Sequence, residues 1–210
     1  MASSDLKIYE PSEVIDYWFG TPGSPERGQR RDIWFKDGRS IDDEVRDQFL
    51  PLHEEAASGR HNRWREDPRS CLALIIVLDQ FPRHMFRDRP LAYATDPQAL
   101  ETAKHALNAQ FDCDRPLLEL NFFYLPFSHA EDLSAQHRGV ELRRAMPQHE
   151  EKAKSVERAI EHMEVVARFG RFPHRNEILG RESTPEEVIF LDENPEAWFV
   201  KYLKRAETGS

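Results

Sequence analysis

The strongest candidate for chemistry in this sequence is the segment 168–181, which reads RFGRFPHRNEILGR. Four arginines stand here against one acid, Glu177, so the segment carries a local charge of +3 in a chain of net charge −9. A guanidinium group presents paired N–H donors that match the two oxygens of a carboxylate or a phosphate group. The segment therefore predicts an anion-binding site, and the alternative is a structural network in which the arginines pair with acids elsewhere in the chain. The predicted ligand-binding residues of this segment are Arg168, Arg171, His174, Arg175, Asn176 and Arg181.

A second polar group follows directly on the seven apolar residues Leu72 to Leu78 and consists of Asp79, Gln80 and Arg83. A buried acid needs a cation, because an unpaired buried charge is strongly destabilising. Arg83 stands at i+4 from Asp79 and reaches it if the helix continues that far; otherwise an arginine of the segment 168–181 is the obvious partner. We predict Gln80 and Arg83 as ligand-binding residues, with a polar network that fixes the helix end as the alternative.

Histidines supply a third candidate. His129 and Glu131 are two residues apart, a spacing that places them on different faces of a helix, although an irregular turn would let them converge. His129 is then a candidate proton carrier, oriented by Glu131 or by Asp79, and these three are the predicted catalytic residues. His162, beside an apolar helix stripe, is a further option. For each histidine, a purely structural role is the alternative interpretation.

Other chemistry has little support in the sequence. There is no Walker loop, no Gly-x-Gly-x-x-Gly and no His-Glu-x-x-His motif. Cys71 lies in the apolar run and Cys113 lies between two aspartates, so neither is expected to be a reactive thiolate. We predict no metal and no other cofactor. No zinc-ligand spacing connects His129, Glu131, His162 and His174.

The composition restricts the partners of this chain. Of its 210 residues, 39% are hydrophobic and 32% are charged, and the acidic surplus argues against binding to nucleic acid or to an anionic membrane surface. The longest apolar run has seven residues, whereas a bilayer crossing takes about 20. The chain opens without a basic and then apolar leader, and its two cysteines make no disulfide framework. We therefore expect a cytoplasmic protein.

Proline and cap signals predict the helices that position these candidate residues. Ser12 and a capping box of Ser40 with Asp43 are expected to start the first two helices. Asp67-Pro68 is expected to start a central buried helix, because the residues after it are apolar all round. Hairpin signals are absent, so the predicted fold class is all-α, built of packed helical hairpins. The expected helices span about 12–19, 41–59 with a kink or break at Pro51, 68–81, 96–107, 133–145 and 147–169, with two more beginning at Pro185 and Pro195. In 147–169 the expected apolar stripe is Val156, Ile160, Met163 and Ala167.

A weak internal repeat relates two segments. Residues 81–100 begin Phe-Pro-Arg-His, residues 172–191 begin Phe-Pro-His-Arg, and both contain a later proline that starts a helix. The simpler interpretation is that prolines end one helix and start the next. The alternative is that two helical halves each direct an Arg/His pair toward one shared cleft. We predict a single helical domain over residues 1–210, within which the repeat indicates two related halves, about 12–111 and 116–204.

Taken together, these motifs resemble the bacterial family of unknown function DUF924. The matching residues read LDQFPR at 78–83, YLP at 124–126 with His129 and Glu131, RFGRFPHRN at 168–176 and LGREST at 179–184. The resemblance runs from about Val14 to Leu191. It implies a tetratricopeptide-like α-α superhelix, and it brings neither an assigned activity nor catalytic residues.

The leading functional hypothesis is a pocket between the two helical halves that binds an anionic small molecule or a peptide carboxylate. The first alternative is an enzyme that acts on an anionic metabolite with a His/carboxylate acid–base pair. The second alternative is a protein-interaction module with an exposed aromatic groove, and the oligomeric state stays open. The aromatic anchors of such a groove would be Trp18, Trp34, Trp64 and Trp198.

Overall fold

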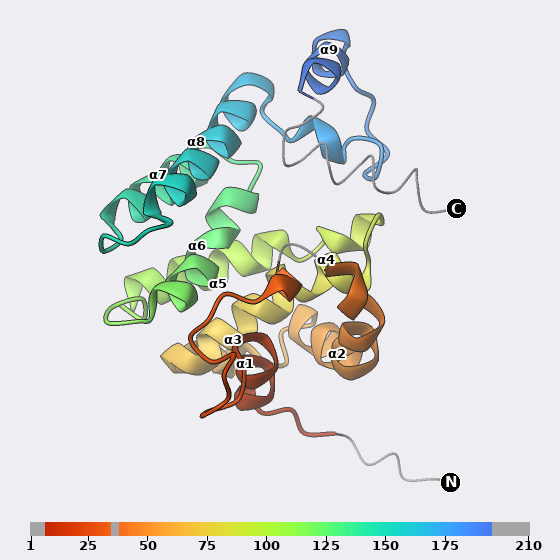
Figure 1. Cartoon of the computed structure of the whole chain (residues 1–210). Helices are drawn as coiled ribbons and strands as arrows, with labels where there is room; N and C mark the ends of the chain where they lie inside the picture. Colours follow the sequence, from red (N-terminus) through yellow and green to blue (C-terminus); the bar gives the residue numbers. More distant parts are fainter. Residues whose placement is uncertain (1–6, 35–37, 195–210) are drawn as a thin grey trace, which may run out of the picture. The chain divides into compact units, whose positions relative to one another are not determined.

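The computed structural model describes residues 7–34 and 38–194 of the chain (Figure 1). All regular secondary structure in these residues is helical, which confirms the predicted all-α class. The finer expectation of a tetratricopeptide-like superhelix stays a prediction. No helix of the described residues combines the length and hydropathy that a bilayer crossing needs. The helix expected to begin at Pro195 lies outside the described residues.

The chain divides into two compact units that are not continuous in sequence. Unit 1 holds Met1–Met85 and Thr95–Pro126, and unit 2 holds Phe86–Ala94 and Phe127–Ser210. The α-helices of unit 1 are α1 (Pro11–Phe19), α2 (Asp42–Ala57), α3 (Pro68–Asp79), α4 (Phe81–Met85), α5 (Asp96–Asn108) and the first part of α6 (Leu117–His129). Those of unit 2 are the end of α6, α7 (Leu133–Ala145), α8 (Lys152–Phe169) and α9 (Pro185–Glu193). The predicted halves, about 12–111 and 116–204, stay a prediction.

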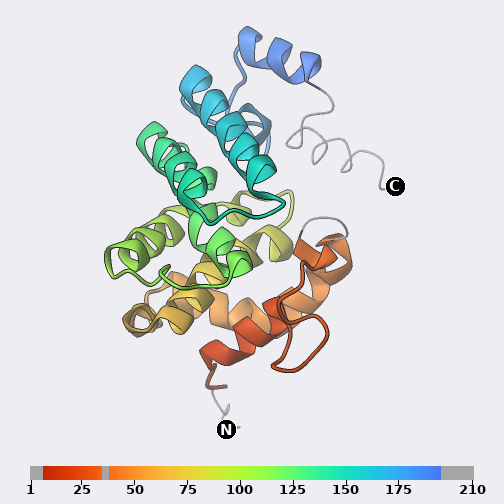
Figure 2. The ribbon, with the colours of Figure 1, turned by 60° about the vertical axis from the view of Figure 1, so that its left-hand side comes forward.

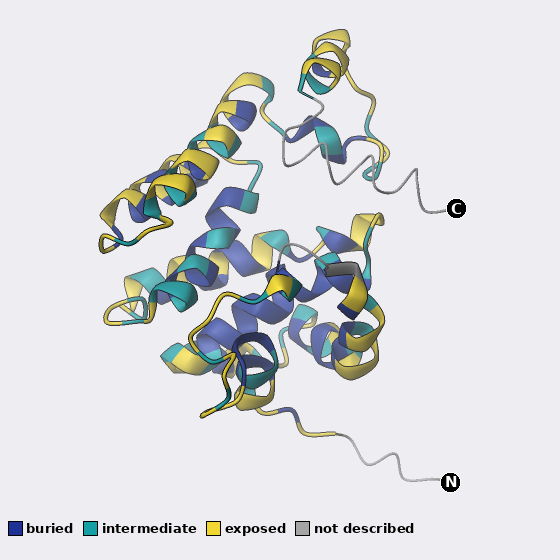
Figure 3. Ribbon diagram, viewed as in Figure 1, coloured by how far each residue is buried: buried dark blue, intermediate teal, exposed yellow. Residues whose placement is uncertain are grey.

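The core of unit 1 forms around α3, as the sequence predicts. Every residue of α3 from Cys71 to Asp79 is buried (Figure 3), and the helix packs against α1, α2 and α5. Phe81 follows α3 and is fully buried, with its ring centroid 4.7 Å from that of Phe49 and 5.7 Å from that of Trp18. Apolar side chains on all sides of α3 leave no face for water, so neighbouring helices surround it.

Local cap signals decide where two helices begin. The Asp67 side chain accepts hydrogen bonds from the backbone N–H groups of Arg69 (2.9 Å) and Ser70 (3.1 Å), so α3 begins as predicted. The Thr184 hydroxyl accepts from the backbone N–H of Glu187 at 3.2 Å, while the Glu187 carboxylate accepts from the backbone N–H of Thr184 at 2.8 Å. This reciprocal capping box starts α9 where the sequence predicts a helix.

Other expected boundaries were wrong. Ser40 is no cap, because a 3-10 helix at Gly38–Ile41 runs directly into α2, whereas a cap residue needs non-helical backbone. Ser12 is no cap either, since α1 begins one residue earlier at Pro11. α2 continues through Pro51 without a break, and α6, a helix that was not predicted from the sequence, continues through Pro126. In both helices buried apolar side chains lie on either side of the proline, so packing compensates for the lost hydrogen bond.

Unit 2 contains α7 and α8 packed side by side (Figures 1 and 2). A Cβ atom on Gly139 of α7 would lie 3.1 Å from Cβ of Phe127, so this glycine permits a close helix approach. α8 begins at Lys152, five residues later than expected, and its buried residues are Ala159, Val165 and Val166. The predicted stripe holds only in part: Val156, Ile160 and Met163 are half-buried, whereas Ala167 is exposed and the packed face turns toward His162.

Truncation of the central aromatic ring tests the core of unit 1. We expect Phe81→Ala to lower the free energy of unfolding by about 3–5 kcal/mol, because the lost ring leaves a cavity among packed aromatic side chains. Urea denaturation measures the change. Ile8→Ala is the control, since Ile8 is 76% exposed and its truncation should stay within about 0.5 kcal/mol. Equal midpoints for the two variants would contradict this description of the core.

Candidate functional site

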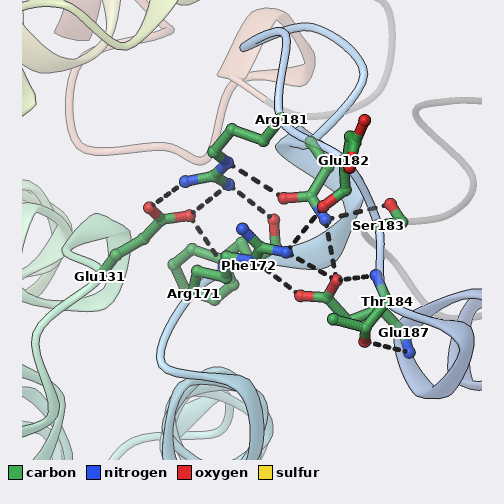
Figure 4. A network of polar contacts seen from close by, with 9 residues as sticks. Glu131, Arg171, Phe172, Arg181, Glu182, Ser183, Thr184 and Glu187 are labelled. Atoms are coloured by element: carbon green, nitrogen blue, oxygen red, sulfur yellow. Dashed lines mark hydrogen bonds and ion pairs between the residues drawn. The ribbon is translucent and has the colours of Figure 1, made fainter.

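Arg181 and Glu131 form a bidentate ion pair in unit 2 (Figure 4). Arg181 donates from Nη1 to Glu131 Oε2 at 2.6 Å and from Nη2 to Oε1 at 2.9 Å, and the backbone N–H of Phe172 donates to Oε1 at 2.8 Å. Although burial raises it, the pKa of Glu131 falls below its usual range because of these hydrogen bonds and the nearby charges of Arg175 and Arg181. Glu131 is therefore an ionised partner of Arg181, and its predicted catalytic role with His129 and Asp79 stays a prediction.

Arg171 forms a second fork, with Glu187 at the start of α9. Nε of Arg171 donates to Oε1 of Glu187 at 2.7 Å, and Nη2 donates to Oε2 at 2.8 Å. The hydrogen bond from Arg171 lowers the pKa of Glu187 to about 2, against the effect of burial and together with the backbone N–H of Thr184. Glu187 thus caps α9 through Oε2 and neutralises Arg171 through both of its carboxylate oxygens.

Asn176 joins the two forks into one network. Its Nδ2 donates to Oε2 of Glu187 at 3.2 Å, and its Oδ1 accepts from Nε of Arg181 at 3.0 Å. Arg168 pairs with Glu186 at 2.9 Å, and both side chains are exposed. Three of the four arginines of the segment therefore bind carboxylates of the chain itself. For these three, the contacts favour the structural interpretation that the sequence left open.

Arg175 differs from the other three arginines of the segment. It is buried, and its guanidinium carbon lies over the rings of Tyr93 and Phe172, 4.6 Å from each ring centroid. Cation–π attraction holds the positive charge at such faces. Tyr93 belongs to unit 2 although the segment Phe86–Ala94 lies between α4 and α5 in the sequence.

Imidazole and guanidinium groups gather around Phe172. The Phe172 ring centroid lies 5.8 Å from that of His162 and 5.5 Å from that of His174, in addition to its contact with Arg175. The pKa of His162 is lowered to about 3, mainly by burial of the imidazole. The nearby charges of His129, Arg143 and Arg175 lower it further. We call this group the cationic cluster, and its members are His129, Arg143, His162, His174 and Arg175.

The tautomer of His162 follows from its hydrogen bond. Nδ1 of His162 lies 2.6 Å from the carbonyl oxygen of Arg158. A carbonyl oxygen only accepts, so the proton of the neutral ring is on Nδ1 and the lone pair is on Nε2. His162 is thus a neutral imidazole in a positive environment.

Sequence reasoning missed two residues of this region, Arg143 and Tyr93. Arg143 is buried on the face of α7 that also buries Gly139 and Val140. Its helical spacing from these residues was the sequence feature that could have identified it as a buried arginine. Tyr93 had no local signal, because only the tertiary structure brings the segment Phe86–Ala94 into unit 2.

The predicted group at the end of α3 lies in unit 1. Asp79 is 0% exposed, and Nη1 of Arg83 lies 3.6 Å from its Oδ1. Arg83 also donates from Nη2 to Oδ2 of Asp96, the first residue of α5, at 3.0 Å. Gln80 donates from Nε2 to Oδ2 of Asp79. Asp79 therefore finds its cation within unit 1, even though α3 ends at Asp79 and α4 begins at Phe81. The ligand-binding role of Gln80 and Arg83 stays a prediction.

Three of the four tryptophans are buried, namely Trp18, Trp34 and Trp64, and Trp198 lies outside the described residues. Those three side chains are core residues rather than anchors of an exposed groove. Within residues 7–34 and 38–194, no three His, Cys, Asp or Glu side chains gather as a metal site would require.

A family model for bacterial proteins of unknown function, DUF924, matches residues 14–195 of the chain. The chain belongs to the DUF924 family. Its fold is similar to the solved structure of a protein of unknown function from Agrobacterium tumefaciens, with a TM-score of 0.76 and 40% sequence identity over 88% of this chain and 97% of that chain. No curated protein matches the chain.

Removal of the Glu187 charge tests the network of this DUF924 protein. We expect Glu187→Gln to cost about 2 kcal/mol at pH 7, because the ionised carboxylate accepts charge-assisted bonds from Arg171. The pKa of Glu187 is lowered from 4.5 to about 2, so this stabilisation is complete above about pH 4.5 and is lost as the pH falls toward 2. Melting curves from pH 2 to 7 should show a wild-type advantage that disappears in acid. Glu186→Gln is the matched control, since Glu186 is exposed.

Titration of His162 tests the environment of the cationic cluster. We expect its imidazole to stay neutral, with the proton on Nδ1, down to about pH 4, because its pKa is lowered from 6.5 to about 3. Nitrogen-15 NMR of labelled histidine reports both the tautomer and the charge. The unfolded imidazole protonates near pH 6.5 and the folded one near 3. Because the unfolded chain therefore binds the proton more tightly, the contribution of His162 lowers the free energy of unfolding as the pH falls from 6.5 to 3. An imidazolium signal from His162 at pH 6 would refute this assignment.

Proposed function

We propose that the cationic cluster of unit 2 binds a small anionic ligand through a carboxylate or phosphate group. The observation that carries the proposal is the convergence of these groups: Phe172 contacts His162, His174 and Arg175, and His129, Arg143 and Arg175 act electrostatically on the neutral imidazole of His162. The group lies in a chain of net charge −9. An anion placed among these groups would reduce their mutual repulsion.

The chemistry of the cluster suits an anion with two oxygens. Arg175 presents a planar guanidinium, and this geometry matches carboxylate and phosphate groups in a bidentate manner. Both Arg143 and Arg175 are buried, and ionic hydrogen bonds are stronger where little water competes. His174 supplies a further imidazole that can donate to an anion. The acidic surplus of the chain supports a small ligand rather than nucleic acid as the partner.

The different contacts of the arginines support the choice of Arg143 and Arg175 as ligand-binding residues. Arg168, Arg171 and Arg181 each hold a carboxylate of the chain, so they stabilise the segment around Arg175. Of the predicted ligand-binding residues, the proposal therefore keeps His174 and Arg175 and adds Arg143. The proposed ligand does not need the unit 1 residues Asp79, Gln80 and Arg83.

The alternatives carry less support than ligand binding. An enzyme that orients His129 through Glu131 would need a carboxylate directed at the imidazole, whereas both oxygens of Glu131 accept from Arg181. An interaction module with an aromatic groove would need exposed tryptophans, and Trp18 is fully buried.

Thermal stabilisation by inorganic phosphate tests the proposal. At a phosphate concentration ten times the Kd, we expect a gain of about 1.4 kcal/mol, because only the folded protein binds the ion. For a chain of this size the gain raises the melting temperature by about 3–5 °C. Sodium chloride at matched ionic strength is the reference, and acetate is the carboxylate probe. Calorimetric titration gives the Kd directly.

Two arginine variants make this test specific. Arg175→Ala should abolish the phosphate-dependent shift, because it removes the buried fork. Arg144→Ala removes the same charge from an exposed position on α7, next to Arg143, and should keep the shift. Absence of any shift with phosphate and acetate, or equal loss in both variants, would rule out binding at this cluster.

A further inference from the structure

Tyr93 reaches the cationic cluster from an unexpected part of the chain. The segment Phe86–Ala94 leaves unit 1 after α4, contributes to unit 2, and returns to unit 1 before α5. Within unit 2, the Tyr93 ring lies against the guanidinium of Arg175 at 4.6 Å. The excursion therefore places an aromatic face at the arginine that the proposed function depends on.

The two rings restrict the orientation of Arg175. Its guanidinium carbon lies over both the Tyr93 ring and the Phe172 ring at the same distance, 4.6 Å. Phe172 is itself fixed, since it is 1% exposed and its backbone N–H donates to Glu131 at 2.8 Å. A flexible arginine side chain loses rotamer freedom when it is confined in this way before any ligand arrives.

We infer that Tyr93 is a positioning residue for the proposed anion site: its ring orients the Arg175 guanidinium so that the site selects two-oxygen anions over monoatomic ones. This inference rests on the proposed function. A second oxygen on the anion strengthens binding to a guanidinium only if the guanidinium plane is held in place, because each of the two parallel hydrogen bonds depends on direction. The aromatic ring, and not the hydroxyl of Tyr93, is the group that acts.

The strength of the ring's electrostatic face can be varied with little change in shape. Tyr93→Phe keeps the face, whereas fluorinated phenylalanines at position 93 weaken it stepwise, with 3,4,5-trifluorophenylalanine as the last member. We expect the phosphate Kd of Tyr93→Phe to stay within about twofold of wild type. The Kd should rise along the series to about tenfold, which is the effect of one desolvated cation–π contact.

A second readout separates positioning from general stability. The ratio of the chloride Kd to the phosphate Kd, and the same ratio for acetate, measure selection of two-oxygen anions. Both ratios should fall along the fluorinated series and in Arg175→Lys, which keeps the charge but loses the fork. Leu91→Ala is the control within the same segment, because Leu91 is 53% exposed, and it should leave the ratios unchanged. Circular dichroism confirms that each variant is folded.

The outcomes distinguish the two proposals. If wild-type protein binds neither phosphate nor acetate, the proposed function fails, and this inference fails with it. If phosphate binding is lost in Arg175→Ala but stays constant along the fluorinated series, the anion site stands and the positioning role of Tyr93 is overturned. A stepwise rise in the phosphate Kd together with a falling ratio supports both.

Discussion

The neutralisation of arginine is the constraint on which the structure of unit 2 depends. A guanidinium that leaves water must find a carboxylate, a carbonyl or an aromatic face, because it cannot lose its proton. Arg181 and Arg171 meet Glu131 and Glu187 in bidentate pairs, and Asn176 connects the pairs. These contacts fix the loop between α8 and α9, and that loop carries Phe172 and Arg175.

The loop in turn determines what the remaining cations do. With its neighbours neutralised by acids, Arg175 lies against aromatic rings and contributes to the field at His162. The register of α8 completes the arrangement, because burial of Ala159 and Val166 places His162 on the packed side of the helix. Helix packing thus supplies the imidazole, and the ion-pair network supplies the guanidinium.

Local signals in the sequence predicted the parts of this structure that depend on neighbouring residues. Asp67 with Pro68 predicted the start of α3, and Thr184 predicted the start of α9, because a capping side chain acts on residues within three positions. The segment 168–181 was recognisable as a polar centre from the sequence because its charged residues are close together in the chain. Partners brought together over long sequence distances were not predictable: the Arg181–Glu131 pair depends on how the chain returns on itself. The buried face of α8 was predicted only in part for a related reason, since its neighbour α7 decides which side of the helix is covered.

The excursion of Phe86–Ala94 also has a consequence for biosynthesis. A ribosome releases Tyr93 long before it has made α8 or the loop that holds Arg175, so the tyrosine must wait for its partner while α5 and α6 emerge. A truncated polypeptide that begins at Phe127 would contain every cation of the cluster and still lack one of its two aromatic walls. The site is therefore completed only when the loop that carries Arg175, which is synthesised late, packs against Tyr93, which is synthesised early.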